Sequence, residues 1–221
     1  MRDPIDRVIS EYKYLSRTHA LDRSLEEFYR APEETNKQYR MIGQVPWQAF
    51  HLVGTLSQYT QCLDVLSESR GLTLSENAVN IAPLKTSDTV NETVRADIRK
   101  WNERDCSFVE DVEKYLQKRL QAYQEGKAFC FHDFGFIPDR HIIGWAFYSE
   151  SDQPVTLELY ADGKVVADIK GCEHRAELQV LKTPRAGHSG FRFELQQYTS
   201  ASHIELKARE TEQTLLSWLR A

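Results

Sequence analysis

The spacing of apolar residues changes once along this chain of 221 residues, and the change divides the chain into two parts. Up to about Gly126, apolar residues recur every three or four positions, the period of α-helices that bury one face. After that point, short segments alternate apolar and polar residues, the period of half-buried β-strands. We therefore predict a mostly helical domain at 1–126, followed by an antiparallel β-sandwich domain at 127–221.

The first part contains recognisable helix starts. Ile5, Val8, Ile9 and Tyr12 form an apolar stripe directly after Asp3-Pro4, a pair suited to an N-cap and the first helical position. Residues 24–27 (SLEE) form a capping box that predicts a second start. The remaining predictions for this part are a short buried strand at 47–53, a helix at about 57–69 that stops at Gly71, a surface loop at 77–91, and one or two helices at 92–124.

The second part contains strands and turn signals. Asp162-Gly163 predicts a two-residue hairpin, since both turn positions require a positive φ. Closely spaced strands without helices between them are typical of an antiparallel sandwich. The strand candidates are 142–148, 155–160, 164–170, 176–181, 191–195 and 204–207.

Composition and charge exclude several classes of protein. The formal net charge of −5 argues against nucleic-acid binding, which usually needs a basic face. No apolar run approaches the roughly 20 residues that span a bilayer, and the first residues lack the apolar core of a signal peptide. We therefore expect a cytoplasmic protein without a transmembrane segment. Its cysteines have no paired spacing, so we expect free thiols and no bound metal.

Residues 2–12 (RDPIDRVISEY) combine three kinds of phosphate-binding group. The guanidinium of Arg2 offers paired donors that match phosphate oxygens. The start of the following helix offers free N–H groups and the positive end of a dipole, and the hydroxyl of Ser10 offers a further donor. The alternative is that Asp3-Pro4 only caps a helix and Arg7 is a solvated charge. The residues themselves leave both interpretations open.

The same segment resembles the 3′-phosphate-binding motif of sulfotransferases, in which an arginine ends a strand and a serine eight positions later lies on the next helix. Four further segments follow in the order found in that family: 24–28 (SLEEF), 36–40 (NKQYR), 52–56 (LVGTL) and, after Val79-Asn80, 101–105 (WNERD). Most members carry an acidic residue near Ser57 or Gln58, which this chain lacks. The first part thus resembles the carboxyl-terminal part of a carbohydrate-type, heparan-sulfate-like sulfotransferase.

This resemblance implies a partial P-loop-like α/β domain and a reaction. The family transfers a sulfuryl group from 3′-phosphoadenosine 5′-phosphosulfate to a hydroxyl group, here of a glycan acceptor. Arg2 and Ser10 would hold the 3′-phosphate of this co-substrate, and Arg40 would be a further contact unless it forms a surface ion pair. The family's 5′-phosphosulfate loop and catalytic base precede this motif, and no G-x-x-x-x-G-K-[ST] segment occurs here. We therefore expect a missing amino-terminal half, an exposed apolar stripe on the first helix, and no assignable catalytic base.

A first prediction concerns sulfotransferase turnover by this chain. Sulfuryl transfer relies on positioning and on neutralising the transferred oxygens, so a donor site without its 5′ side should be inactive. Labelled donor, incubated with the chain and a panel of polysaccharides, is expected to show no transfer above a heat-killed control. Measurable transfer would contradict this expectation.

The second part carries a resemblance of its own. Residues 143–146 (IGWA), 159–165 (LYADGKV), 190–193 (GFRF) and Arg175 resemble a small β-domain attached to bacterial glycan-modifying enzymes. This implies a bacterial protein whose second part contacts a polysaccharide or packs on the catalytic part, and which associates with membranes only through partners. Two alternatives remain: a non-catalytic polysaccharide-binding or structural remnant, and one piece of a split enzyme. A fold-level resemblance does not decide between them.

Overall fold

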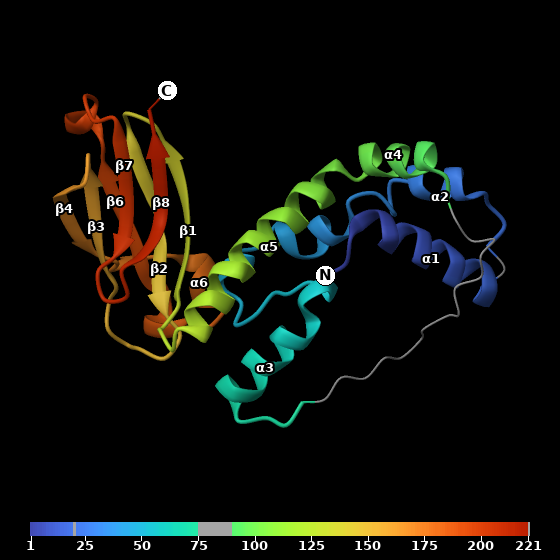
Figure 1. Cartoon of the computed structure of the whole chain (residues 1–221), viewed down its shortest axis with the longest axis horizontal. Helices are drawn as coiled ribbons and strands as arrows, with labels where there is room; N and C mark the ends of the chain where they lie inside the picture. The colour runs from blue at the N-terminus through green and yellow to red at the C-terminus, as the bar shows by residue number, and fades with distance from the viewer. Residues whose placement is uncertain (20, 75–89, 221) are drawn as a thin grey trace. The chain divides into compact units, whose positions relative to one another are not determined.

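The computed structural model describes residues 1–19, 21–74 and 90–220, and it contains two compact units (Figure 1). The first unit comprises 1–45 and 52–120, and the second comprises 46–51 and 121–221. The division falls at 120/121, whereas the predicted boundary is at 126/127, and the short segment 46–51 belongs to the second unit. The chain combines a helical part with antiparallel sheets, as predicted.

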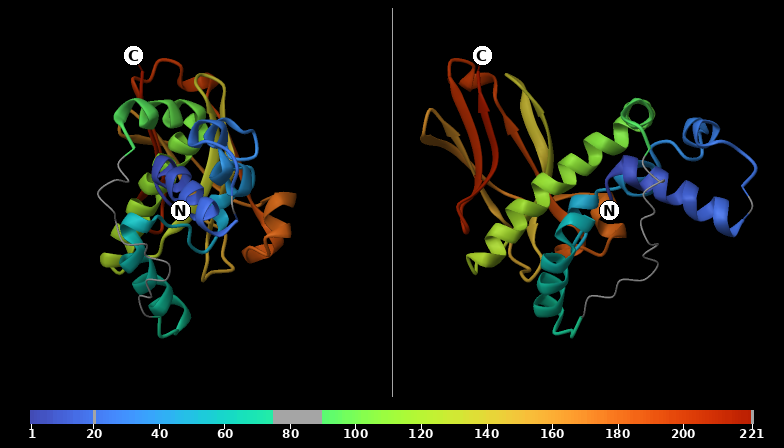
Figure 2. Two further views of the ribbon diagram at one scale, coloured as in Figure 1. Left: turned by 90° about the vertical axis from the view of Figure 1, so that its right-hand side faces the viewer. Right: turned by 45° about the vertical axis from the view of Figure 1, so that its right-hand side comes forward.

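Helices form the first unit. Three of them, α1, α2 and α4, pack against one another, and Figure 2 shows this group from two further sides. The helical segments are, in chain order, α1 (Pro4–Thr18), α2 (Leu25–Arg30), the π-helix η1 (Tyr39–Gly43), the 3₁₀ helix η3 (Leu56–Gln58), α3 (Tyr59–Arg70), α4 (Glu92–Trp101) and α5 (Glu103–Gln124).

The predicted helix starts are confirmed. The carboxylate of Asp3 accepts a hydrogen bond of 2.8 Å from the N–H of Asp6, and Pro4 is the first residue of α1. In α2, the Ser24 hydroxyl accepts from the N–H of Glu27 and the Glu27 carboxylate accepts from the N–H of Ser24, which completes the capping box. Local chemistry therefore decides where these two helices begin.

The apolar stripe of α1 is buried, so the expectation that it would be exposed is wrong. Ile5 is 2% exposed and Val8 is fully buried, because α2 and α4 cover this face. Phe28 of α2 and Ile98 of α4 complete the same core. The first unit thus supplies its own partners for the stripe, at a gain of about 1.5–3 kcal/mol for each large side chain that is removed from water.

Two other predictions for this region have clear outcomes. Residues 92–124 form two helices, α4 and α5, as one of the two predicted options. The strand predicted at 47–53 is wrong: Trp47–Ala49 form a 3₁₀ helix, η2, which packs on strand β1 of the second unit and buries Trp47. An apolar run of this length fits a buried turn as well as a strand. The loop predicted at 77–91 lies largely outside the described residues, which resume at position 90.

The second unit contains two four-stranded antiparallel sheets that face each other across one core (Figure 1). One sheet has the strand order β1-β2-β6-β5 and the other has the order β4-β3-β7-β8. Phe191 from the first sheet and Leu157 from the second are both fully buried in this core. The strands are β1 (Cys130–Ile137), β2 (His141–Tyr148), β3 (Thr156–Ala161), β4 (Lys164–Lys170), β5 (Glu173–His174), β6 (His188–Glu194), β7 (His203–Ala208) and β8 (Gln213–Leu219).

The predicted hairpin joins β3 and β4. Asp162 and Gly163 have φ values of 49° and 78°, so both turn positions lie in the left-handed region as predicted. The strand predicted at 176–181 is wrong, because Ala176–Val180 form the short helix α6. Of its apolar side chains, Leu178 is buried whereas Val180 is 81% exposed, so the alternation in the sequence does not correspond to a buried strand face.

Among the described residues, none of the helices is both long enough and apolar enough to cross a bilayer.

Candidate functional site

The start of α1 is attached to two other segments of the first unit. The side-chain amide of Gln38 donates to the carbonyl oxygen of Arg2 at 2.9 Å and accepts from the N–H of Arg2 at 3.0 Å. The ammonium group of Met1 donates to the carbonyl oxygen of Gly54, and the N–H of Leu56 donates back to Met1 at 2.7 Å. Segments 36–40 and 52–56, both singled out in the sequence, therefore meet the residues around Arg2.

Asp105 of α5 forms several hydrogen bonds to residues 36–39, which lie next to Arg2. Its side chain is fully buried and accepts the N–H groups of Gln38 and Tyr39 at 3.2 and 2.7 Å. Its own N–H donates to the side-chain oxygen of Asn36, while the N–H of Asn36 donates to Asn102 at 2.9 Å. Segment 101–105 thus forms the polar support around which residues 36–39 fold.

Arg7 connects α1 to the same support. Its guanidinium donates to the Glu11 carboxylate at 2.7 Å and to the carbonyl oxygen of Glu34 at 2.9 Å, and it lies 3.8 Å from the Asp105 carboxylate. The side chain is only 12% exposed, so the interpretation of Arg7 as a solvated charge is wrong. Its Nε is buried and has no hydrogen-bond partner among the residues described here.

Lys37 adds a second cation to the ionic cluster that Arg7 forms with nearby carboxylates. Its ammonium group contacts the carboxylates of Glu11 and Glu34. Burial acts to lower the pKa of Lys37, but the two carboxylates outweigh burial and the pKa is raised. The cluster therefore holds its charges in opposite-sign contacts inside the unit, as buried ions require.

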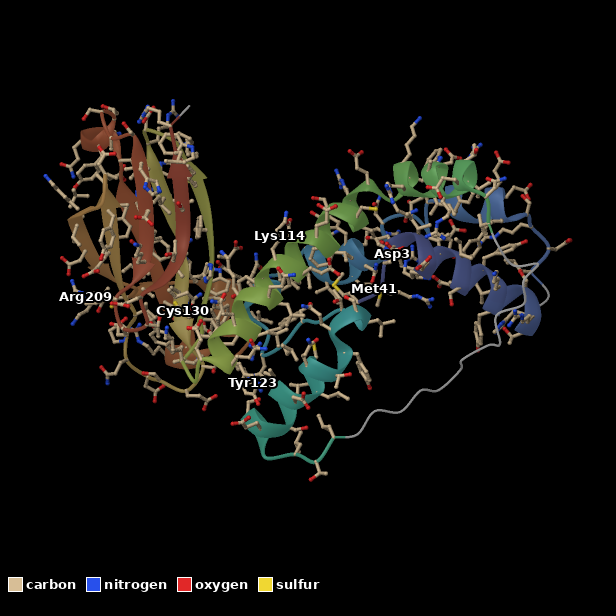
Figure 3. All side chains as sticks on the ribbon, viewed as in Figure 1. Asp3, Met41, Lys114, Tyr123, Cys130 and Arg209 are labelled. Carbon is tan, nitrogen blue, oxygen red and sulfur yellow. The ribbon has the colours of Figure 1, made fainter. Side chains whose placement is uncertain are left out.

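The three predicted site residues belong to the start of α1, to α1 itself and to η1. Arg2 has an exposed side chain just before α1, and Ser10 is partly buried on α1, one turn after Arg7. Arg40 lies in η1, where its exposed guanidinium donates to the carbonyl oxygen of Glu33. Figure 3 labels Asp3 at the start of α1 and Met41 in η1, the two elements that carry these residues. Within the described parts of the chain, the three side chains form no hydrogen bonds to each other.

The amino terminus of α1 already holds two carboxylates. Asp3 accepts the N–H of Asp6, and Asp6 forms an ion pair with Arg95 at 3.0 Å. These negative charges offset the positive end of the helix dipole, which an incoming phosphate would otherwise use. An anion bound here would therefore depend mainly on the guanidinium of Arg2.

The motif residues of the second unit meet at Arg175. Its guanidinium donates to the carbonyl oxygen of Gly144 at 3.0 Å, and a Cβ atom at Gly190 would lie 2.7 Å from its Nε. Arg175 also precedes α6 as its N-cap residue. The glycines of the 143–146 and 190–193 segments thus provide space and a hydrogen-bond acceptor for one arginine, which links β2, β6 and α6.

The sequence reasoning missed the roles of Asn36, Asn102 and Asp105. The usable signal was that short polar side chains recur within two segments that carry the family resemblance, next to buried aromatic residues such as Phe108. All four cysteines are free thiols, as expected. Within the described ranges, His, Cys, Asp and Glu side chains do not gather in groups of three or more that could hold a metal ion.

Comparison with known proteins adds no relative. No protein-family model matches the chain, and neither a curated protein nor a solved structure matches it.

Proposed function

We propose that the first unit is the 3′-phosphate-binding part of a sulfotransferase-type protein that uses 3′-phosphoadenosine 5′-phosphosulfate to modify a glycan hydroxyl. In this proposal the guanidinium of Arg2 pairs with the 3′-phosphate, the hydroxyl of Ser10 donates to it, and Arg40 adds positive charge from η1. An arginine suits this task because its planar donors match two phosphate oxygens at once.

The observation that supports this proposal best is that segments distant in sequence meet at one place. Four of the segments that carry the family resemblance, 2–12, 36–40, 52–56 and 101–105, are spread over about half of the chain. Hydrogen bonds from Gln38 to Arg2 and Asp105, and from Leu56 to Met1, connect these segments at the start of α1. Residues that serve one site in a fold are expected to meet in this way, although none of them needs to touch the ligand.

The surrounding contacts suit the task of positioning Arg2. The main chain of Arg2 is bound on both its N–H and its carbonyl oxygen, so its side chain leaves the backbone from a fixed point. Arg7 and Lys37 neutralise the carboxylates of Glu11 and Glu34 beneath it. Rigid support of this kind lowers the entropic cost of holding a phosphate.

Binding of a 3′-phosphorylated nucleotide is the second prediction. We expect adenosine 3′,5′-bisphosphate to shift the amide signals of residues 2–10 in a titration of the full chain, and adenosine 5′-monophosphate not to do so. The 3′ contacts alone should support a Kd of about 1 mM, which corresponds to about 4 kcal/mol. Arg2→Ala should abolish the response. The matched control is Arg140→Ala, an exposed arginine in the turn after β1, which should leave it unchanged.

Two results would contradict this proposal. One is an equal response to both nucleotides, which would indicate binding without recognition of the 3′-phosphate. The other is a bisphosphate response that survives Arg2→Ala.

A second candidate function is a non-catalytic structural or polysaccharide-binding protein. It is favoured by the Asp3 carboxylate, which occupies the N–H of Asp6 at the terminus where a phosphate would bind. In that case residues 2–12 form only a capped helix, and neither nucleotide shifts their signals. The same titration therefore separates the two candidates.

A further inference from the structure

We propose that His174 and His188 form a two-histidine site for a divalent transition-metal ion such as Zn²⁺ or Ni²⁺ at the edge of the β1-β2-β6-β5 sheet. The two residues are far from segments 2–10 in sequence and belong to the other unit. The inference is therefore independent of the proposed nucleotide site. It also departs from the expectation, drawn from the sequence, that the chain holds no metal.

An irregularity in strand pairing brings the two histidines together. In the β5–β6 ladder, Glu173 pairs with Gly190, but the next residue, His174, pairs with His188 rather than with Ser189. The extra residue on β6 is a bulge, a feature that changes which side chains face each other. Ser189 is fully buried, whereas both histidines are exposed, so the bulge places two imidazoles opposite each other on the solvent side.

The separation of the two rings fits one shared metal ion. The two ring centres lie 4.9 Å apart, and the ring planes are inclined by 50°. Two imidazoles that bind one tetrahedral zinc ion through nitrogen atoms at about 2.1 Å place their ring centres about 5 Å apart. The pair is therefore close to the separation needed for chelation, and the remaining positions around the ion would be filled by water.

Hydrogen bonds leave the required nitrogen atoms available. Nε2 of His174 lies 3.0 Å from the side-chain oxygen of Gln179 on α6, and Nδ1 of His188 lies 3.1 Å from the carbonyl oxygen of Arg185. Both of these oxygens only accept, so each imidazole must donate there. In the neutral rings, Nδ1 of His174 and Nε2 of His188 then carry the lone pairs. Metal-binding histidines are typically oriented by such a bond from their other ring nitrogen.

Neighbouring groups limit the site to two protein ligands. No third His, Cys, Asp or Glu in the described ranges joins the pair to make a larger metal-binding group. Cys172 is exposed, and its sulfur accepts a hydrogen bond of 3.5 Å from Arg185. The histidine pair accordingly suits metals that imidazole binds well, rather than Ca²⁺ or Mg²⁺, which prefer oxygen ligands.

The site can be tested on the full chain with its thiols kept reduced. We expect added Ni²⁺ to broaden amide signals around positions 174 and 188, and added Zn²⁺ to raise the melting temperature of the second unit, since the metal binds the folded form. His174→Asn or His188→Asn should each weaken metal binding at least about tenfold, and Gln179→Ala about tenfold through loss of ring orientation. The controls, His203→Asn on β7 and Cys172→Ser, should bind as the unaltered chain does.

Two outcomes would overturn the proposal. One is metal binding that persists unchanged in both single histidine variants. The other is binding that Cys172→Ser abolishes, which would assign the site to the thiol. Both histidines are exposed, so their variants should fold normally, and an unchanged amide spectrum without metal verifies this.

Discussion

Replacing Asp105 with alanine should destabilise the first unit by about 3 kcal/mol, because a buried carboxylate that serves several partners would be lost. The N–H groups of Gln38 and Tyr39 would remain buried without their acceptor. Arg7 would lose a nearby negative charge, although it would keep Glu11 as a partner. Asp105→Asn keeps one acceptor oxygen and should therefore cost less.

The effect can be measured by urea unfolding, followed through amide signals that belong to each unit separately. This separation matters because a chain with two units need not unfold in one transition. The matched control is Asp111→Ala, which removes an exposed carboxylate from the same helix and should change stability by less than about 0.5 kcal/mol. Similar losses in the two variants would mean that the contacts of Asp105 do not support the fold as described.

The Asp105 variant also bears on the proposed nucleotide site. Because Asp105 holds the N–H of Gln38, and Gln38 holds the main chain of Arg2, its loss should loosen Arg2. A variant that is still folded at low temperature should thus bind adenosine 3′,5′-bisphosphate more weakly than the unaltered chain. This would occur although Asp105 itself never contacts the ligand.

The second large effect is expected for Gly144→Ala in β2. A Cβ atom at this position would collide with the carbonyl oxygen of Asp133 and would lie 2.5 Å from Cβ of Phe134 on the neighbouring strand. β2 lies between β1 and β6, so the strand cannot move without disturbing two ladders. We expect a loss of about 3 kcal/mol from the second unit, at the upper end of the usual cost of overpacking.

A glycine on the adjacent strand offers a matched control for this variant. Gly135 of β1 is exposed, and a Cβ there would meet only the carbonyl oxygen of Ile143, at 4.0 Å. Gly135→Ala should therefore be nearly neutral in the same urea experiment. If the two variants lost equal stability, the cost would come from glycine in strands generally and not from the close contact at Gly144.

Parts of the candidate site could be predicted from the sequence and parts could not. The sequence indicated Arg2, Ser10 and Arg40 as candidates, and it singled out the segments 36–40 and 101–105, which meet near Arg2. The contacts of Asp105 could not be predicted, because its partners lie more than 60 residues away in the chain. The pairing of His174 with His188 depends on a bulge, which shifts strand register without leaving a clear pattern in the sequence.

The sequence by itself determined those features that depend on neighbouring residues. Asp3 and Pro4 start α1, the Ser24–Glu27 capping box starts α2, and Asp162-Gly163 forms the hairpin, because each signal acts within one turn of backbone. The change from helical to strand periodicity likewise separated the helical part from the sheets.

Tertiary structure alone decided the features that depend on distant partners. The α1 stripe is buried because α2 and α4 pack on it, and Trp47 lies in a 3₁₀ turn because β1 offers it a surface. Strands β1 and β8 were not predicted, since a strand is stabilised by its neighbours in the sheet rather than by its own residues. Residues 176–180 alternate apolar and polar side chains like a strand yet form α6. Only Leu178 among their apolar side chains is buried, which a short helix achieves as well as a strand.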